Sequence, residues 1–226
     1  ANNSVVQIEV DVYDCPSGPA QSETSKLSST VDKERLAIWS NSYRNKLVAD
    51  VVREEMRLFP SEQILVYVDK IEHALYLKRE LPPEFIMVTG EPDDEERIDT
   101  LRGLGLITSE TVFTDRKARK AYQTQFENKE IKYVICNKVW QKGVSFNHLS
   151  LLVRADGSSS EITTVQASGR VSRTADGKSV GRVIDFRDSF NANWTNKYKS
   201  RLEDYTENGW KITHKTYVRT AQTPTK

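Results

Sequence analysis

Hydrophobic residues fall into short continuous runs along the chain. Five runs predict strands that are covered on both faces, since unbroken apolar runs are typical of buried parallel strands. They are Ile64–Val68, Phe85–Val88, Tyr133–Cys136, Leu149–Val153 and Arg182–Phe186. A further strand is predicted near the start of the chain, at Val5–Tyr13.

Between the strands, apolar residues recur at helical spacing. One stripe consists of Leu47, Val48, Val51, Val52, Leu58 and Phe59, and a second of Ile71, Ala74, Leu75 and Leu81. Asp69 stands where it would cap the second helix. Alternating strands and helices predict an α/β fold with a mainly parallel sheet and helices on both faces.

The chain divides into three predicted segments. Residues 1–30 hold the leading strand and a linker over 14–30 that is rich in Pro, Gly, Ser and Thr, and residues 31–188 form the main domain. An acidic stretch without a strong period, about 91–114, is predicted as an insertion. Residues 189–226 form an aromatic helix that packs on the domain, followed by a tail. The helix contains Phe190, Trp194, Tyr198, Leu202 and Tyr205.

Composition excludes several classes of protein. Lys and Arg number 33 against 32 Asp and Glu, so net charge indicates no partner. Cys15 and Cys136 lie far apart, and the three histidines lack metal-ligand spacing, so we expect no disulfide framework and no metal site. No apolar run approaches the roughly 18 residues of a membrane span. The polar start is no signal peptide, and it lacks Met, so we expect a cytoplasmic fragment of a longer protein.

Candidate chemistry centres on residues 158–173. Ser158 and Glu161 form a capping-box pattern that predicts a helix after the strand Leu149–Val153. On that helix Gln166, Arg170 and Arg173 share one face. Planar guanidinium groups match phosphate oxygens, so this face suits a polyphosphate. The alternative is a solvated helix whose arginines pair with surface carboxylates.

Gly169 supports the first interpretation, because Gly costs about 1 kcal/mol relative to Ala in a helix interior and here indicates close approach to a ligand. Val165–Arg173 resembles Q-x-x-G-R-x-x-R, motif VI of superfamily 2 helicases. Ile64–Lys70 resembles motif IV, Val88–Gly90 the turn that follows the next strand, and Phe126–Val144 the run that ends in motif V. The resemblance covers about residues 44–188. Within the superfamily, the sequence most resembles UvsW-type phage helicases and related DNA-repair translocases.

This resemblance implies a second, C-terminal RecA-like domain of an ATP-dependent DNA helicase or translocase. The protein is expected in the cytoplasm, or in the host cytoplasm if it comes from a phage. Arg170 and Arg173 would stabilise the transferring phosphate, and Gln166 would orient or sense it. Gly143, Ser145 and Gly169 would contact ATP, although Ser145 and Asn137 depart from the residues of many relatives. ATP and Mg²⁺ would be bound mainly by an N-terminal RecA-like domain, which is the expected partner.

Nucleic acid, DNA rather than RNA, is the other expected partner. In parallel α/β sheets ligands gather at the carboxyl ends of the strands. The residues expected there combine small polar groups with two lysines, which would hold a phosphate backbone without reading bases. They are Asp69, Lys70, Thr89, Gly90, Asn137 and Lys138. Ordinary surface loops are the alternative interpretation.

Two segments imitate nucleotide motifs. Asp176–Ser179 looks like the end of a phosphate loop but precedes a strand instead of a helix, and is predicted to be a turn. Asp93–Glu96 precedes Arg97 and is better explained as a helix N-terminus than as a Mg²⁺ motif. Without a phosphate loop the chain alone should be inactive. Two alternatives remain, a non-catalytic nucleic-acid-binding or regulatory module and an unrelated nucleotide-binding enzyme, and the missing loop disfavours the second.

Overall fold

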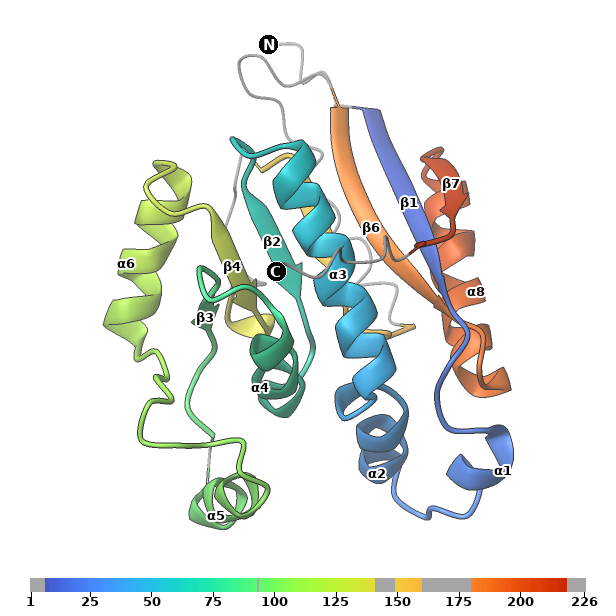
Figure 1. Cartoon of the computed structure of the whole chain (residues 1–226), viewed down its shortest axis with the longest axis horizontal. Coiled ribbons are helices and arrows are strands. Elements are labelled where there is room, and N and C mark those ends of the chain that lie inside the picture. The colour runs from blue at the N-terminus through green and yellow to red at the C-terminus, as the bar shows by residue number, and fades with distance from the viewer. Residues whose placement is uncertain (1–6, 93, 141–148, 160–179, 219–226) are drawn as a thin grey trace, which may run out of the picture.

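A computed structural model describes residues 7–92, 94–140, 149–159 and 180–218. Within these ranges seven strands form one sheet in the order β3-β4-β2-β5-β6-β1-β7, and all neighbours run parallel (Figure 1). The strands are β1 (Gln7–Cys15), β2 (Ile64–Tyr67), β3 (Ile86–Val88), β4 (Tyr133–Cys136), β5 (Leu151–Arg154), β6 (Val180–Asp188) and β7 (Lys211–Lys215). The prediction of an α/β fold with a parallel sheet is confirmed.

Helices connect the strands and cover both faces of the sheet. The longer ones are α3 (Ser42–Leu58), α4 (Ile71–Glu80), α5 (Glu95–Gly103), α6 (Arg116–Glu127) and α8 (Ala192–Glu207). The shorter ones are α1 (Gln21–Thr24), α2 (Thr30–Glu34), the π-helix η1 (Arg35–Trp39) and the 3₁₀ turn η2 (Lys138–Trp140). In the described ranges no helix combines the length and apolar content that crossing a membrane requires.

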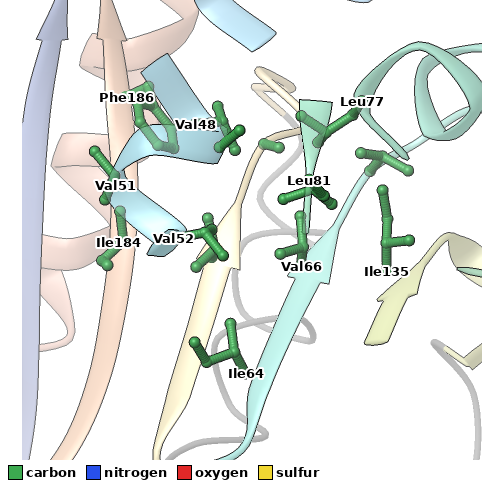
Figure 2. Close-up of a cluster of buried hydrophobic side chains, with 14 of the residues drawn as sticks. Val48, Val51, Val52, Ile64, Val66, Leu77, Leu81, Ile135, Ile184 and Phe186 are labelled. Atoms are coloured by element: carbon green, nitrogen blue, oxygen red, sulfur yellow. The ribbon is translucent and has the colours of Figure 1, made fainter. Parts of the chain in front are cut away.

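Two hydrophobic cores lie on opposite faces of the sheet, because successive strand residues point to opposite sides. Figure 2 shows the first, in which Val48 and Val52 of α3 and Leu77 of α4 face Val66 and Ile184 of the strands. The second core joins the alternate strand residues to side chains of α6 and α8. Its members include Leu65, Val134, Leu152, Val183, Phe126, Tyr198 and Tyr205. Burial on both faces explains why these strands have no polar alternation.

The leading strand is part of the sheet. β1 lies between β6 and β7, and its whole length pairs with β6, from Gln7 opposite Val180 to Cys15 opposite Asp188. The 14–30 stretch that follows, predicted as a loop, contains the single turn α1. The strand therefore packs with the main domain instead of standing ahead of it, and the segment boundaries at 30 and 188 stay predictions.

Other predictions have mixed outcomes. The acidic residues before Arg97 do begin a helix, since Asp94 caps α5 and accepts a hydrogen bond from the Arg97 N–H. Leu101 and Leu106 of the predicted insertion pack on Leu75, which fixes this segment to α4. The predicted aromatic helix corresponds to α8, but it begins at Ala192, so Phe190 precedes the helix instead of belonging to it. The prediction was wrong at the end of the first apolar stripe, because α3 ends at Leu58, and Leu58 and Phe59 are exposed.

His73 ties α4 to α3 in the interior. Its Nε2 lies 3.2 Å from Oδ1 of Asn45, and its Nδ1 is buried without a hydrogen-bond partner among the described residues. Burial, and to a smaller extent the positive charge of Arg44, lowers the pKa of His73 well below its ordinary value of 6.5. The folded protein therefore holds this imidazole neutral.

Acidification should destabilise the protein through His73. Below about pH 6.5 the unfolded chain binds a proton that the folded chain refuses, so the free energy of unfolding should fall by up to about 1.4 kcal/mol per pH unit. His73→Gln removes the titration, so the stability of the native protein relative to this variant should decline between pH 7 and pH 5. Urea unfolding of both proteins at several pH values measures this, and a constant difference would contradict it.

Candidate nucleic-acid and nucleotide interface

The carboxyl ends of β2, β3 and β4 meet at one edge of the sheet, the lower edge in Figure 1. Tyr67 of β2 and Val88 of β3 both lie level with Cys136 of β4. The predicted nucleic-acid residues are those that follow these three strand ends. Parallel pairing therefore brings together segments that are far apart in the sequence.

Asp69 and Lys138 are in direct contact at this edge. The Asp69 carboxylate lies 2.9 Å from the Lys138 Nζ and 3.8 Å from the Lys70 Nζ. The lysine side chains are 52% and 43% exposed, whereas that of Asp69 is 22% exposed. One carboxylate thus holds two ammonium groups that face solvent.

The predicted cap by Asp69 was wrong. Lys70 occupies the N-cap position of α4 in an extended conformation, and no side chain caps this helix. Asp69 precedes the cap by one residue, and its carboxylate pairs with Lys138 instead. This ion pair, which joins the residues after β2 and β4, explains why the acidic Asp69 lies among basic residues.

Thr89 and Asn137 are less accessible than the lysines. The Thr89 carbonyl accepts hydrogen bonds from the Thr114 N–H at 3.2 Å and from Thr114 Oγ1 at 2.6 Å. Its own Oγ1 is buried and has no partner among the described residues. Asn137 is 8% exposed, and its carbonyl accepts from the Trp140 N–H in η2. Gly90 is half-buried beside Thr89.

A basic helix start that the sequence analysis missed lies beside Thr89. Thr114 leads through the N-cap residue Asp115 into α6, whose first turns contain Arg116, Lys117 and Lys120, all exposed. The hydrogen bonds between Thr114 and Thr89 bring this helix start to the same edge as Lys138. The density of basic residues after position 115 was the available signal, but the preceding insertion obscured its place in the fold.

Buried charges occupy the other half of the edge, at the ends of β5 and β6. Arg154 holds the Asp156 carboxylate through Nε at 3.2 Å and Nη2 at 2.9 Å. Arg44 of α3 holds Asp188 and donates to the Ala155 carbonyl at 2.6 Å. All three arginine and aspartate pairs here, including Arg201 with Asp185, are nearly or fully buried.

The electrostatics of this half keep the Asp185 carboxylate charged. Burial alone would raise the pKa of Asp185, but the guanidinium groups of Arg201 and Arg154 and hydrogen bonds from Arg201 and Tyr205 outweigh it and lower that pKa below its ordinary value. Burial alone would lower the pKa of both arginines, but Asp156 chiefly raises that of Arg154, and Asp185 raises that of Arg201. Asp185, Arg154 and Arg201 are therefore ionised over the whole physiological range of pH.

The predicted nucleotide residues lie outside the described residues. Gln166, Gly169, Arg170 and Arg173 fall within 160–179, as do Glu161 of the capping box and the turn 176–179. Gly143 and Ser145 fall within 141–148, and Asp93 is also outside. Among the residues that are described, no three His, Cys, Asp or Glu side chains gather closely enough to hold a metal ion.

A parallel sheet with helices on both faces, together with the helicase motifs in their order along the chain, defines the second RecA-like domain of a superfamily 2 helicase. The sequence matches the model of the helicase conserved C-terminal domain over residues 48–175, which is more than half of the chain. The chain belongs to this family. No curated protein sequence matches it.

Solved structures share the fold. T4 UvsW has a TM-score of 0.56 and 17% identity over 95% of this chain and 42% of its own. The C-terminal domain of the DEAD-box protein Dbp5 has a TM-score of 0.55 and 16% identity over 92% of this chain and 90% of its own. S. cerevisiae Dbp5 bound to RNA and ADP BeF3 has a TM-score of 0.54 and 16% identity over 92% of this chain and 41% of its own. The chain thus spans less than half the length of two of these three structures.

Proposed function

We propose that this chain is the C-terminal motor domain of an ATP-dependent DNA helicase or branched-DNA translocase. The observation that carries the proposal is the group of solvent-facing cations at the carboxyl edge. Lys70, Lys138 and the start of α6 surround small polar groups there. Such a surface suits a phosphate backbone, which it would hold irrespective of base sequence.

Asp69 limits the attraction of this surface for nucleic acid. It neutralises part of the charge of Lys70 and Lys138, so that single phosphates would be exchanged readily as the motor moves. DNA is favoured over RNA by the sequence resemblance to UvsW-type helicases. Dbp5, solved with RNA, supports only the shared fold, so the binding experiments compare both nucleic acids.

For ATP, we propose the roles that motif VI implies. Arg170 and Arg173 stabilise charge on the transferring phosphate, Gln166 orients or senses it, and the backbone around Gly143, Ser145 and Gly169 approaches the nucleotide. The family match, which extends to residue 175, supports this assignment. ATP and Mg²⁺ are held mainly by an N-terminal RecA-like domain, and no step here depends on a metal bound by this chain.

The chain alone should hydrolyse no ATP and should bind it weakly, because one side of a composite site lacks the loop and metal ligands that supply most contacts. Steady-state ATPase measurements on the purified chain, with and without DNA, provide the test. Turnover that Lys178→Ala abolishes would instead point to a self-contained nucleotide site at residues 176–179.

Replacing Lys70 and Lys138 with Ala should weaken nucleic-acid binding equally for all sequences. Because each phosphate contact releases a counterion, the slope of log affinity against log salt should decrease in magnitude by about 1.4 on single strands. Fluorescence anisotropy on DNA and RNA oligonucleotides over a range of salt concentrations measures both effects.

Lys211 and Lys215 of β7 give a matched control, since they too pair with acidic residues but lie on the opposite edge strand. Their double Ala variant should keep the affinity and slope of the native chain. Equal losses in both variants would mean that overall charge, and not the carboxyl edge of β2–β4, governs binding.

In the full-length protein with both motor domains, Arg170→Ala or Arg173→Ala should reduce ATP turnover by about 10³-fold or more, whereas folding and nucleic-acid binding largely survive. Lys at either position should restore little, because an ammonium group cannot reproduce the planar fork. Melting temperature and ATPase rate are measured on the same samples.

Val171→Ala, on a different face of the predicted helix, serves as the control. It should lower the melting temperature through lost packing without a selective loss of turnover. Arginine variants with normal turnover, or with activity reduced only in proportion to stability, would show that these arginines are structural.

A further inference from the structure

The turn at residues 155–159, which leads from β5 to the segment that carries motif VI, is held by three buried arginines. One of them, Arg201, belongs to α8, which lies beyond the family match at residues 48–175. We propose that Arg201, with Asp185 and Tyr205, is a positioning residue for the motif VI arginines. This inference rests on the proposed function and adds a helix to the catalytic unit.

The contacts of Arg201 join three parts of the fold. Its Nε and Nη2 donate to the Asp185 carboxylate of β6 at 2.8 and 3.1 Å. Its Nη2 also donates to the Phe186 carbonyl at 3.0 Å, and its Nη1 donates to the Ser158 carbonyl at 3.0 Å. A single rigid guanidinium group thus fixes the last described residues before position 160 relative to the central sheet.

Tyr205, one turn further along α8, extends the link to β5. Its hydroxyl donates to Asp185 at 2.8 Å and accepts from Nη1 of Arg154 at 3.2 Å. Arg154 in turn holds Asp156, whose Oδ2 accepts from the Ser158 N–H at 3.2 Å. Both backbone groups of Ser158 are therefore tied, directly or through Asp156, to charged side chains that α8 helps to hold.

The backbone of the turn leaves little freedom for another arrangement. Gly157 has a φ of +66°, and a Cβ added there would lie 3.1 Å from Cδ1 of Ile38. Arg44, from the other face of the sheet, donates to the Ala155 carbonyl at 2.6 Å. Opposite layers thus clamp a turn that is itself irregular.

Stability alone does not account for this arrangement. Buried ion pairs rarely stabilise a fold more than well-packed apolar residues would, because both charges must be removed from water. Trp194 and Tyr198 already bury one face of α8. Fully buried charges that converge on carbonyls of one turn instead specify its geometry. A displacement of about 1 Å in reacting groups can reduce a rate about 10²-fold, so this geometry matters for turnover.

Arg201→Lys in the full-length protein tests the proposal, since it keeps the charge but loses the fork that reaches Asp185 and Ser158 together. We expect kcat for ATP to fall about 10- to 10²-fold, with little change in KM or in DNA affinity. Arg182→Lys is the matched control. Arg182 lies in β6 and donates from both of its Nη atoms to the Glu55 carboxylate, away from the turn. It should lower the melting temperature without lowering kcat.

Adding Arg201→Lys to a variant that carries both Arg170→Ala and Arg173→Ala separates positioning from a general loss of stability. If Arg201 acts through these two arginines, the triple variant should be no slower than the variant that lacks both of them. Additive losses, or equal losses of kcat in the Arg182 and Arg201 variants, would overturn the proposal. Normal kcat in Arg201→Lys with a slow Arg170→Ala would overturn it and leave the proposed function standing.

Normal turnover in Arg170→Ala would overturn both the proposed function and this inference. If Arg201→Lys does not fold, Tyr205→Phe replaces it, because this variant removes only the hydroxyl between Asp185 and Arg154. It should show the same selective loss of kcat at smaller amplitude, and an unchanged kcat in this variant would overturn the proposal.

Discussion

The arginine–aspartate pairs buried at the ends of β5 and β6 are the interaction on which the carboxyl edge depends. Parallel pairing places both strand ends at this edge, where Asp185 and Asp188 are removed from water. A buried carboxylate needs a charged partner, and α3 and α8 supply one each from opposite faces of the sheet. The layers are thereby fixed to the edge by charge as well as by apolar packing.

Sequence reasoning succeeded where one interaction dominates. Continuous apolar runs identified β2, β4 and β6 because burial on both faces leaves no polar alternation. β7 was missed because only one of its residues, Ile212, is apolar and the strand is mostly exposed. The Asp69 cap was wrong because the competing partner, Lys138, lies in a segment far along the chain. Pairing between distant segments leaves no local signal.

The buried arginines are a second case in which pairing between distant segments leaves no local signal in the sequence. Arg44 and Arg201 lie in helices whose charged residues the sequence alone would place in solvent, yet both are fully buried. Only the topology reveals that Asp188 and Asp185 face them. Motif VI could be recognised without the fold because its residues are close in sequence, whereas the groups that position it could not.

The charged groups in the two halves of the edge differ in exposure and in pairing: two exposed lysines share one carboxylate, whereas each buried arginine has a carboxylate of its own. Lys70 and Lys138 are solvent-facing point charges, whereas Arg154 and Arg201 are buried planar forks that bind carboxylates of the protein. β2 connects the halves. The Tyr67 carbonyl accepts from the Ala155 N–H at 2.9 Å, two residues before Asp69.

The side chain of Tyr67 sits at the same junction. Burial, followed by the charges of Asp156 and Asp69, raises its pKa, so the hydroxyl stays neutral between the two halves. The Tyr67 backbone thus lies between the loop that holds Asp69 and the turn that Arg44 and Arg201 contact. The solvent-facing lysines and the buried arginines are then two parts of one edge that β2 joins.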